Sequence, residues 1–286
     1  MTSRPDEPPL QNHGDLPDGT DAAAREAIAF LRQCLRTQTD TVQRYLWRDL
    51  QVWVKRGVKP RPRWHFWLLG LMASVVRLPA LAPVYNPGGR RAVRTEARRL
   101  RELAARGLRV PPVLAELPDG FLMEHMGRPG RHAPSLAEEM NENKVDHPET
   151  VLALFVQGLH ATGRVHAVGT CLSQGFARNL VHCPDGVIGY VDFEDDPQAS
   201  MPMVQCQLRD ILCYVHSSAV YLLEAGQLEA ARGPWRAWLD ARPAAVQSLV
   251  STSARRMRWL RFLPRDRRWG RDLQRARAAW ELLEGR

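Results

Sequence analysis

The spacing of apolar residues changes several times along the chain, and each spacing predicts a different element. Over residues 21–38, apolar side chains recur at helical intervals, which predicts an amphipathic helix. Over residues 42–56, they alternate with polar ones on both sides of Arg48 and Asp49, so we expect a β-hairpin. The run HFWLLGLMASVV, residues 65–76, is apolar throughout and predicts a buried helix, because it is too short to cross a bilayer.

The middle of the chain combines one helix with two short strands. Residues 91–106 include TEARRLRELAAR and predict a helix that Gly107 closes as a C-cap. The segments VPPVLAEL and FLMEHM then predict two strands joined by a turn at Asp119 and Gly120. The polar residues 127–146 predict a connecting loop.

The second half of the chain is mainly helical in pattern. A helix is expected over residues 148–163, and residues 203–286 again show helical spacing. Between them, strands at 179–182 and 187–193 flank a Pro-Asp-Gly turn. A β-rich half followed by a helical half predicts an α+β fold in two lobes, with an N-terminal helical extension.

The expected domain limits follow from these patterns. Residues 1–20 are polar, rich in Pro and Gly, and lack the apolar stretch of a signal peptide, so we expect a disordered segment. Residues 21–127 form the expected β-rich lobe, including the helical extension and the inserted apolar helix. Residues 128–286 form the expected helical lobe, which contains the loop region and ends in basic helices.

Composition and charge narrow the class of protein. The 286 residues are 44% hydrophobic and 25% charged, which is typical of a globular protein with a substantial core. The five cysteines are never spaced as CxxC, which argues against a disulfide framework or a zinc site and favours a reducing compartment. The formal net charge of +9 comes almost entirely from arginine, so a lysine inside an apolar strand stands out.

The segment GYVDFEDDP gathers acids at the end of an expected strand, in spite of the positive net charge. Carboxylates so close together repel one another unless a cation lies among them. Asp192 ends the strand and is therefore the acid expected to need a partner. The acids that follow, Glu194, Asp195 and Asp196, could belong to a metal–phosphate site with Asp192 as its direct ligand, but the pattern favours a solvated loop over further ligands.

Four residues in chain order have the side chains that phosphoryl transfer requires. Lys55 ends a strand, Glu96 lies near a helix start, Asn179 precedes a turn and Asp192 follows it. A lysine can bind phosphates, a carboxylate can hold that lysine, and a second carboxylate with an amide oxygen can hold Mg²⁺. This order matches the protein-kinase residue set, although Glu102 competes with Glu96 for the same role.

The stretch from about Tyr45 to Val215 resembles the kinase-like phosphotransferases of bacteria, in particular the lipopolysaccharide-core and Kdo kinase group. The matching phrases are, in order, VWVK, EARRLRELAARGLRVPPVLA, FLMEHMG, LHATGRVH, ARNLV–PDG–VDFEDDP and QLRD. The resemblance implies a two-lobed protein-kinase-like fold with ATP and Mg²⁺ in the cleft between the lobes.

The same resemblance implies roles for individual residues. Lys55 would bind phosphate and Glu96 would orient Lys55. The carbonyl of Glu124 and the amide of Met126 would bind adenine. Asn179 and Asp192 would hold Mg²⁺, and Asp210 in QLRD would support the catalytic loop.

Two departures from the family pattern bear on catalysis. Gln174 stands five residues before Asn179, where the family has Asp, and glutamine can position a hydroxyl group but cannot accept its proton. An alignment on LHATGRVH makes His166 the loop residue instead, and a candidate base. The glycine-rich loop is also missing, because no glycine lies between Thr20 and Gly57.

The sequence therefore leaves two main functions open. One is an ATP-dependent phosphotransferase acting on a sugar hydroxyl, of lipopolysaccharide core or another acceptor. The other is a non-catalytic pseudokinase that binds nucleotide or serves as a regulatory partner of another protein.

The basic C-terminal stretch adds a third function, an adaptor at a membrane surface. It mixes arginines with Trp259, Phe262 and Trp269, so an anionic membrane or glycolipid is a candidate partner. The alternative is an ordinary helix pair whose basic side faces solvent, while Leu260 and Leu263 pack inward. No nucleic-acid motif is present, so that partner is not favoured. The expected location is cytoplasmic, or peripheral at the inner face of the inner membrane.

Overall fold

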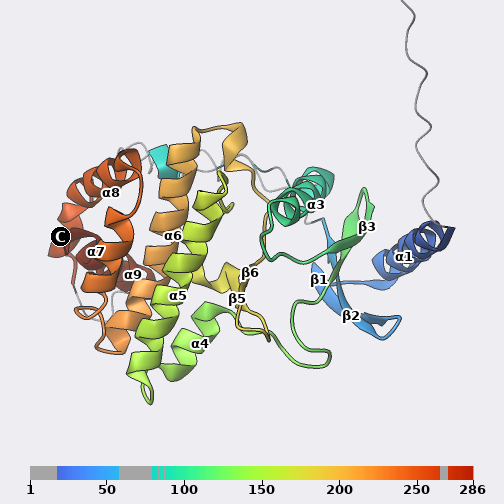
Figure 1. The fold of residues 1–286 in the computed structure, drawn as a ribbon, viewed down its shortest axis with the longest axis horizontal. Coiled ribbons are helices and arrows are strands. Elements are labelled where there is room, and N and C mark those ends of the chain that lie inside the picture. The colour runs from blue at the N-terminus through green and yellow to red at the C-terminus, as the bar shows by residue number, and fades with distance from the viewer. Residues whose placement is uncertain are drawn as a thin grey trace, which may run out of the picture.

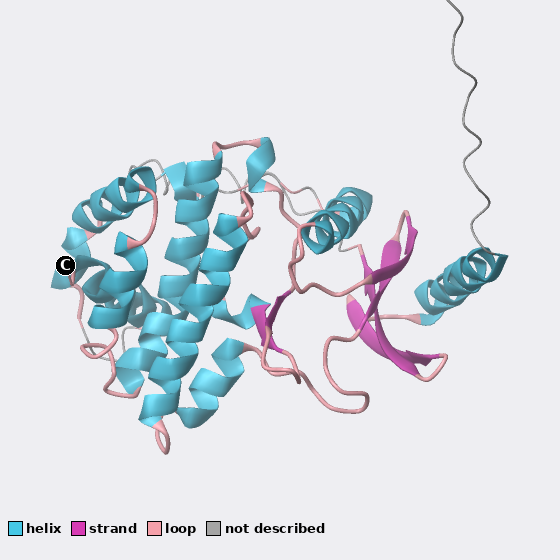
Figure 2. Cartoon of the chain, viewed as in Figure 1, coloured by secondary structure: helices cyan, strands magenta, loops and turns pink. Residues whose placement is uncertain are grey.

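The computed structural model describes residues 18–57, 79–82, 84, 86, 88–264 and 270–285. Within them, a small antiparallel sheet with two flanking helices lies beside a larger group of helices (Figure 1). The mixed α+β class expected from the sequence is therefore confirmed (Figure 2). The expected apolar helix at 65–76 and most of the expected disordered segment at 1–20 lie outside the described residues.

The sheet has four strands in the order β1-β2-β4-β3. The expected hairpin is confirmed: β1 (Val42–Trp47) and β2 (Leu50–Arg56) pair with Val42 opposite Lys55. Arg48 and Asp49 form the turn with φ of 48° and 62°, the left-handed backbone that a two-residue hairpin turn requires. The other two strands are β3 (Val113–Leu117) and β4 (Gly120–Glu124), and β4 pairs with β2.

The alternation of side chains along β2 decides which residues reach the two faces of the sheet. Val52 and Val54 are fully buried against α1 (Asp18–Thr37), through Ala27 and Leu31 of that helix. Because side chains alternate along a strand, Lys55 points to the opposite face. That face is covered by α3 (Gly89–Ala105).

Helix α3 connects the sheet with the helical part of the molecule. Its buried residues, Val93, Ala97, Leu100 and Leu103, belong to the main hydrophobic core. Arg99 of α3 donates a 2.6 Å hydrogen bond to the carbonyl of Cys171, which lies beyond the sheet. The helix ends before Gly107, whose φ of 77° agrees with the expected C-cap.

The helical part is built around two long helices, α5 (Pro148–Ala167) and α6 (Met203–Glu224). The rings of Phe155 and Tyr214 stack between them with centroids 5.7 Å apart. Gly158 permits this approach, since a Cβ there would lie 2.0 Å from the Tyr214 hydroxyl oxygen. Around this pair lie α7 (Arg232–Asp240), α8 (Ala244–Arg256) and α9 (Arg271–Glu284), so the expected helical second half is confirmed.

A small hairpin lies between the sheet and the helices. Strands β5 (Leu180–His182) and β6 (Ile188–Tyr190) pair around the expected turn. The described chain also contains short 3₁₀ segments, at Pro79–Leu81, Ala177–Asn179, Pro197–Ala199 and Arg258–Phe262. Strand β6 is shorter than the strand expected there, so Asp192 lies beyond β6 and not within it.

The connecting loop expected over residues 127–146 is a wrong prediction in part, because it contains α4 (Leu136–Asn143). Ser135 caps this helix: its side chain accepts from the Glu138 amide, and the Glu138 carboxylate accepts from the Ser135 amide. The spacing Ser-x-x-Glu is a helix-start signal that the sequence carried. None of the described helices is both long and apolar enough to cross a membrane.

Candidate functional site

Lys55 lies at the centre of a cluster of charges between β2 and α3. Its Nζ atom is 2.8 Å from Glu96 Oε2 and 3.1 Å from Asp192 Oδ1. Glu96 is 41 residues away in sequence and Asp192 is 137 residues away. Three of the residues that the sequence singled out for phosphate and metal chemistry therefore converge on one point.

Glu96, rather than Glu102, holds the lysine. Glu96 lies on the buried face of α3 and is 3% exposed. It also accepts a hydrogen bond from the backbone N–H of Phe193 at 3.3 Å. Glu102 forms a surface salt bridge with Arg98 instead, which settles the choice between the two.

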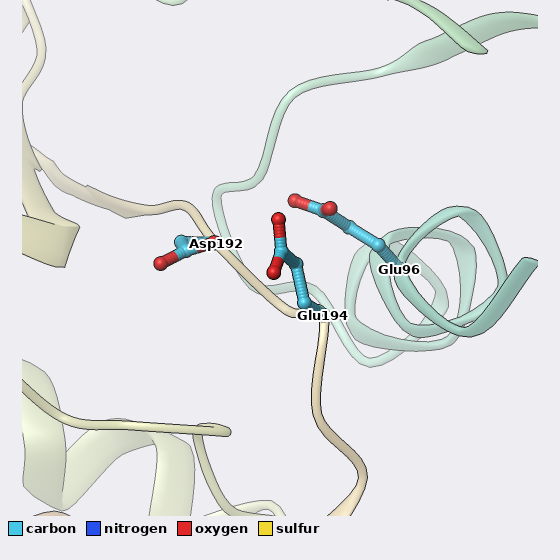
Figure 3. A group of neighbouring side chains, drawn as sticks. All are labelled: Glu96, Asp192 and Glu194. Atoms are coloured by element: carbon cyan, nitrogen blue, oxygen red, sulfur yellow. The ribbon is translucent and has the colours of Figure 1, made fainter. Parts of the chain in front are cut away.

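Glu194 is the third carboxylate of the cluster. It lies in a loop, as expected, but its side chain is only 28% exposed and contacts Lys55. Its Oε1 lies 3.0 Å from Lys55 Nζ. Figure 3 shows that Glu96 comes from a helix, and that Asp192 and Glu194 come from the extended segment facing it. Ligand oxygens of these three residues lie within 4.8 Å of one another.

The cluster carries more negative than positive charge. Burial alone would lower the pKa of Lys55, but the carboxylates, Glu96 foremost, raise it overall, so the ammonium stays charged. Burial raises the pKa of Glu96 to about 7, although Lys55 opposes the shift. Three carboxylates around one ammonium leave an excess of oxygen ligands, which suits a hard divalent cation.

Asp192 is held in an uncommon backbone conformation. Its φ is 70°, the left-handed region that costs a non-glycine residue energy. Phe193 next to it is 1% exposed and packs in the main core, while the backbone N–H of Val191 donates to Asn179. The neighbours on both sides are thus fixed, and they hold the Asp192 carboxylate toward Lys55.

A cavity of about 350 Å³ opens beside the charge cluster. Lys55, Glu96 and Asp192 line it together with residues 124–126, at the end of β4. The remaining walls are mostly apolar or aromatic: Val42, Trp53, Leu100, Pro111, Met123, His132, Ala133, Val181 and Val191. Its size and lining are typical of a small-molecule site.

The wall formed by Trp53 and His125 was not foreseen from the sequence. The Trp53 indole N–H donates to His125 Nδ1 at 3.0 Å, across 72 residues of chain. His125 Nε2 in turn lies 2.9 Å from the carbonyl oxygen of Arg131. No local pattern signals this pair, because it depends on the pairing of β2 with β4.

Gln174 and Asn179 lie next to each other but do not line the cavity. The Asn179 amide donates to the Gln174 carbonyl at 3.1 Å, which leaves its side-chain oxygen for another partner. The Gln174 amide donates to Asp195 Oδ2 at 2.9 Å, and the Ser173 hydroxyl donates to the Asp195 carbonyl. Asp196 is bound by Arg98 at 2.6 Å. Asp195 and Asp196 thus lie in the expected loop, where they are half-buried and hold contacts to other segments.

His166, the other candidate for the catalytic base, has a buried side chain that contacts Asp210 instead of the cavity. Its Nε2 lies 3.1 Å from Asp210 Oδ2, and its side chain is 6% exposed. Asp210 also accepts from the backbone N–H of Leu172 at 2.7 Å, two residues before Gln174. Burial raises the pKa of Asp210, while His166 and Leu172 oppose that shift. Asp210 therefore supports the loop that carries Gln174, and His166 belongs to that support.

Comparison of the sequence with models of known protein families and with curated proteins gives no match. The geometry of the site is therefore what bears on function.

Proposed function

We propose that the protein binds ATP and transfers its terminal phosphoryl group, using a two-lobed protein-kinase-like fold. The observation that carries the proposal is the convergence of Lys55, Glu96 and Asp192 from distant segments on the edge of one cavity. Phosphoryl transfer depends mainly on positioning and on neutralising charge, and these are the residue types it requires.

Each residue has a role that its contacts support. Lys55 binds phosphate oxygens, and Glu96 holds the Lys55 ammonium in place. Asp192 and the side-chain oxygen of Asn179 would hold Mg²⁺, since its ligands are hard oxygens and the Asn179 amide nitrogen, not the oxygen, bonds to Gln174. Bound Mg²⁺ would supply neutralisation of phosphate charge. Glu124 and Met126 line the same cavity, and the Glu124 carbonyl and the Met126 amide would bind adenine.

A second candidate is a pseudokinase that binds ATP without transferring phosphate. The presence of Gln174 where the family has an acid favours this function, since the amide cannot accept a proton from a hydroxyl group. In addition, the Gln174 side chain is already engaged with Asp195. A dissociative transition state depends weakly on a base, so slow transfer remains compatible with the same residues.

The acceptor and the cellular location are proposed from the family resemblance and from the exposed aromatic and basic residues near the C-terminus. The resemblance favours a sugar hydroxyl of lipopolysaccharide core. Trp259 is 48% exposed and Phe262 is 75% exposed, and Arg261 lies over the Phe262 ring. Such a surface suits peripheral attachment to an anionic membrane face. Trp269 lies outside the described residues.

Thermal unfolding with ATP, with and without Mg²⁺, tests the nucleotide proposal. A protein that binds the complex gains stability with the logarithm of the ligand concentration over its dissociation constant. We expect wild type to be stabilised only by ATP with Mg²⁺, and Asp192→Asn to lose that gain. Absence of any shift in wild type would remove both the transferase and the nucleotide-binding pseudokinase.

Transfer of a γ-phosphate label separates the two candidates that remain. Label that reaches an acceptor or water in wild type, and not in Lys55→Met, supports the phosphotransferase. Binding without label transfer supports the pseudokinase. Vesicle binding that is lost in Trp259→Ala/Phe262→Ala, with ATP binding intact, would support membrane attachment.

A further inference from the structure

A second cavity, of about 460 Å³, lies beside the cavity proposed for ATP. The two share His132, Ala133 and Val181 in their walls. The second cavity has no part in the roles assigned above. Its remaining lining comes from α4, α6, α9 and the 3₁₀ segment at Ala177–Asn179: Ser135, Ala137, Glu138, Asn141, Arg178, Tyr221 and Arg271.

Two arginines line this cavity, and each rests on an aromatic ring. The Arg178 guanidinium carbon lies 4.3 Å from the centroid of the Phe176 ring. The Arg271 guanidinium carbon lies 5.8 Å from the centroid of the Tyr221 ring. Stacking orients a planar guanidinium and leaves the N–H groups on its edge able to donate.

Neither arginine is neutralised within the part of the chain that the structure describes. No salt bridge or hydrogen bond joins the Arg178 or Arg271 side chain to another described residue. This contrasts with Arg98, Arg101 and Arg109, each of which holds a carboxylate. Two arginines that face a cavity without such a partner mark a place for an anion.

The carboxylate in the cavity wall is committed elsewhere. Glu138 Oε2 accepts from the Ser135 amide at 2.7 Å and from the Ser135 hydroxyl at 2.9 Å. The same oxygen lies 3.2 Å from His132 Nε2. The hydrogen bond from the Ser135 backbone lowers the pKa of Glu138, so the carboxylate remains ionised as the cap of α4. It therefore leaves the two arginines to an external ligand.

The chemistry of the lining defines the ligand class. A guanidinium group matches the oxygens of a phosphate monoester, which accepts two parallel N–H bonds from one arginine. The Ser135 and Asn141 side chains add polar contacts, and Tyr221 and Ala137 add an apolar wall. The volume fits a small molecule rather than a bare ion.

We propose that this cavity binds a phosphate group carried by the molecule that accepts the phosphoryl group. The acceptor role rests on the proposed function; the anion site itself does not. Arg178 immediately precedes Asn179 on the 3₁₀ segment, so one short piece of backbone carries both the anion site and the candidate Mg²⁺ ligand. Binding of the phosphate group at Arg178 would thereby position the acceptor beside the nucleotide cavity.

The test titrates the full chain with inorganic phosphate and with glucose 6-phosphate at constant ionic strength, following thermal stability. Lys55→Met is included because it removes the cation of the nucleotide cavity only. Arg36→Gln is the matched control, because Arg36 is exposed on α1 and lies in neither cavity. We expect Arg178→Gln and Arg271→Gln each to weaken binding at least tenfold, and Arg36→Gln and Lys55→Met to bind as wild type does.

Unchanged affinity in Arg178→Gln and Arg271→Gln overturns the proposal. So does a loss in Lys55→Met as large as in the arginine variants, since the phosphate would then occupy the nucleotide cavity. Vesicles of phosphatidic acid against phosphatidylcholine distinguish the source of the phosphate. Arg178-dependent binding to the vesicles alone indicates a lipid-borne group, and binding to glucose 6-phosphate alone indicates a soluble one.

The outcome for the proposed function is read separately. If phosphate binding depends on Arg178 but ATP with Mg²⁺ gives no stabilisation, the anion site stands and the acceptor role falls. If labelled phosphate is transferred, Arg178→Gln is expected to raise KM for a phosphorylated acceptor at least tenfold while the affinity for ATP stays unchanged. An unchanged KM would overturn the acceptor role.

Discussion

Two clusters of ionisable side chains in this protein differ in how far they are exposed to solvent. Asp210 is fully buried. Its Oδ2 accepts a hydrogen bond from the Leu172 amide and lies 3.1 Å from His166 Nε2. Around Lys55, three carboxylates meet one ammonium beside a cavity. The Asp210 cluster is closed off from solvent within the core, whereas the Lys55 cluster is open to a cavity and holds three carboxylates that could bind a metal ion.

The largest expected effect comes from breaking the closed cluster. Asp210→Ala leaves the Leu172 N–H and His166 without their buried acceptor, so we expect the free energy of unfolding to fall by about 3–5 kcal/mol. Urea denaturation measures it. Asp210→Asn, which keeps an acceptor oxygen, should lose less. A wild-type midpoint for Asp210→Ala would show that this cluster does not support the fold.

The open cluster should reveal itself through pH. The pKa of Glu96 is about 7 in the folded protein, above the ordinary value of 4.5 that it has when unfolded. The folded state therefore keeps a proton that the unfolded state has released, and the free energy of unfolding falls as pH rises from 4.5 to 7. The slope is at most about 1.4 kcal/mol for each pH unit.

Glu96→Gln removes this titration, so its stability should change less steeply over the same pH range. Denaturation of both proteins at several pH values measures the difference. If the free energy of unfolding changed equally with pH in wild type and Glu96→Gln, burial would not raise the pKa of Glu96.

A smaller effect, of opposite sign, is expected at Asp192. Glycine adopts a φ of 70° without strain, and it also removes one of three like charges, so Asp192→Gly should raise the free energy of unfolding by about 1 kcal/mol. The same variant should lose stabilisation by ATP with Mg²⁺. Asp192→Ala separates the two causes, because it removes the charge and keeps the strained backbone. A lower free energy of unfolding in Asp192→Gly would show that the backbone conformation and charge of Asp192 do not destabilise the protein.

The smallest effect is expected at the rim of the cluster. Arg98 bridges Glu102 and Asp196, but its side chain is 48% exposed. Exposed ion pairs contribute little, so Arg98→Gln should change the free energy of unfolding by less than about 0.5 kcal/mol. Thermal unfolding at low and high salt tests this. If Arg98→Gln lowered the free energy of unfolding as much as Asp210→Ala, the exposed ion pairs of Arg98 would matter as much as the buried contacts of Asp210.

Much of the fold was predictable because the signals are local. Alternation fixed the β1–β2 hairpin around Arg48 and Asp49, and helical spacing with Gly107 fixed α3 to within two residues at its start. The α4 helix was missed even though its capping box at Ser135 and Glu138 was visible, because the surrounding residues are polar. The convergence of Lys55 with Glu96 and Asp192 was expected only through residue order.

The rest of the site could not be read from local pattern. Glu194 looked like a loop residue, and only the path of the chain after Phe193 brings it to Lys55. In the same way, Gln174 meets Asp195, and Trp53 meets His125, through contacts between separate segments. Burial likewise decides which helix carboxylate holds the lysine.

By itself, the sequence determined which elements form and which side chains are available for chemistry, because backbone periodicity and residue type act over a few neighbouring positions. Tertiary structure alone decided how many carboxylates share one ammonium, which histidine contacts a buried acid, and which arginines face a cavity without a carboxylate partner among the described residues. These are distances between segments far apart in the chain, and packing of the whole core sets them.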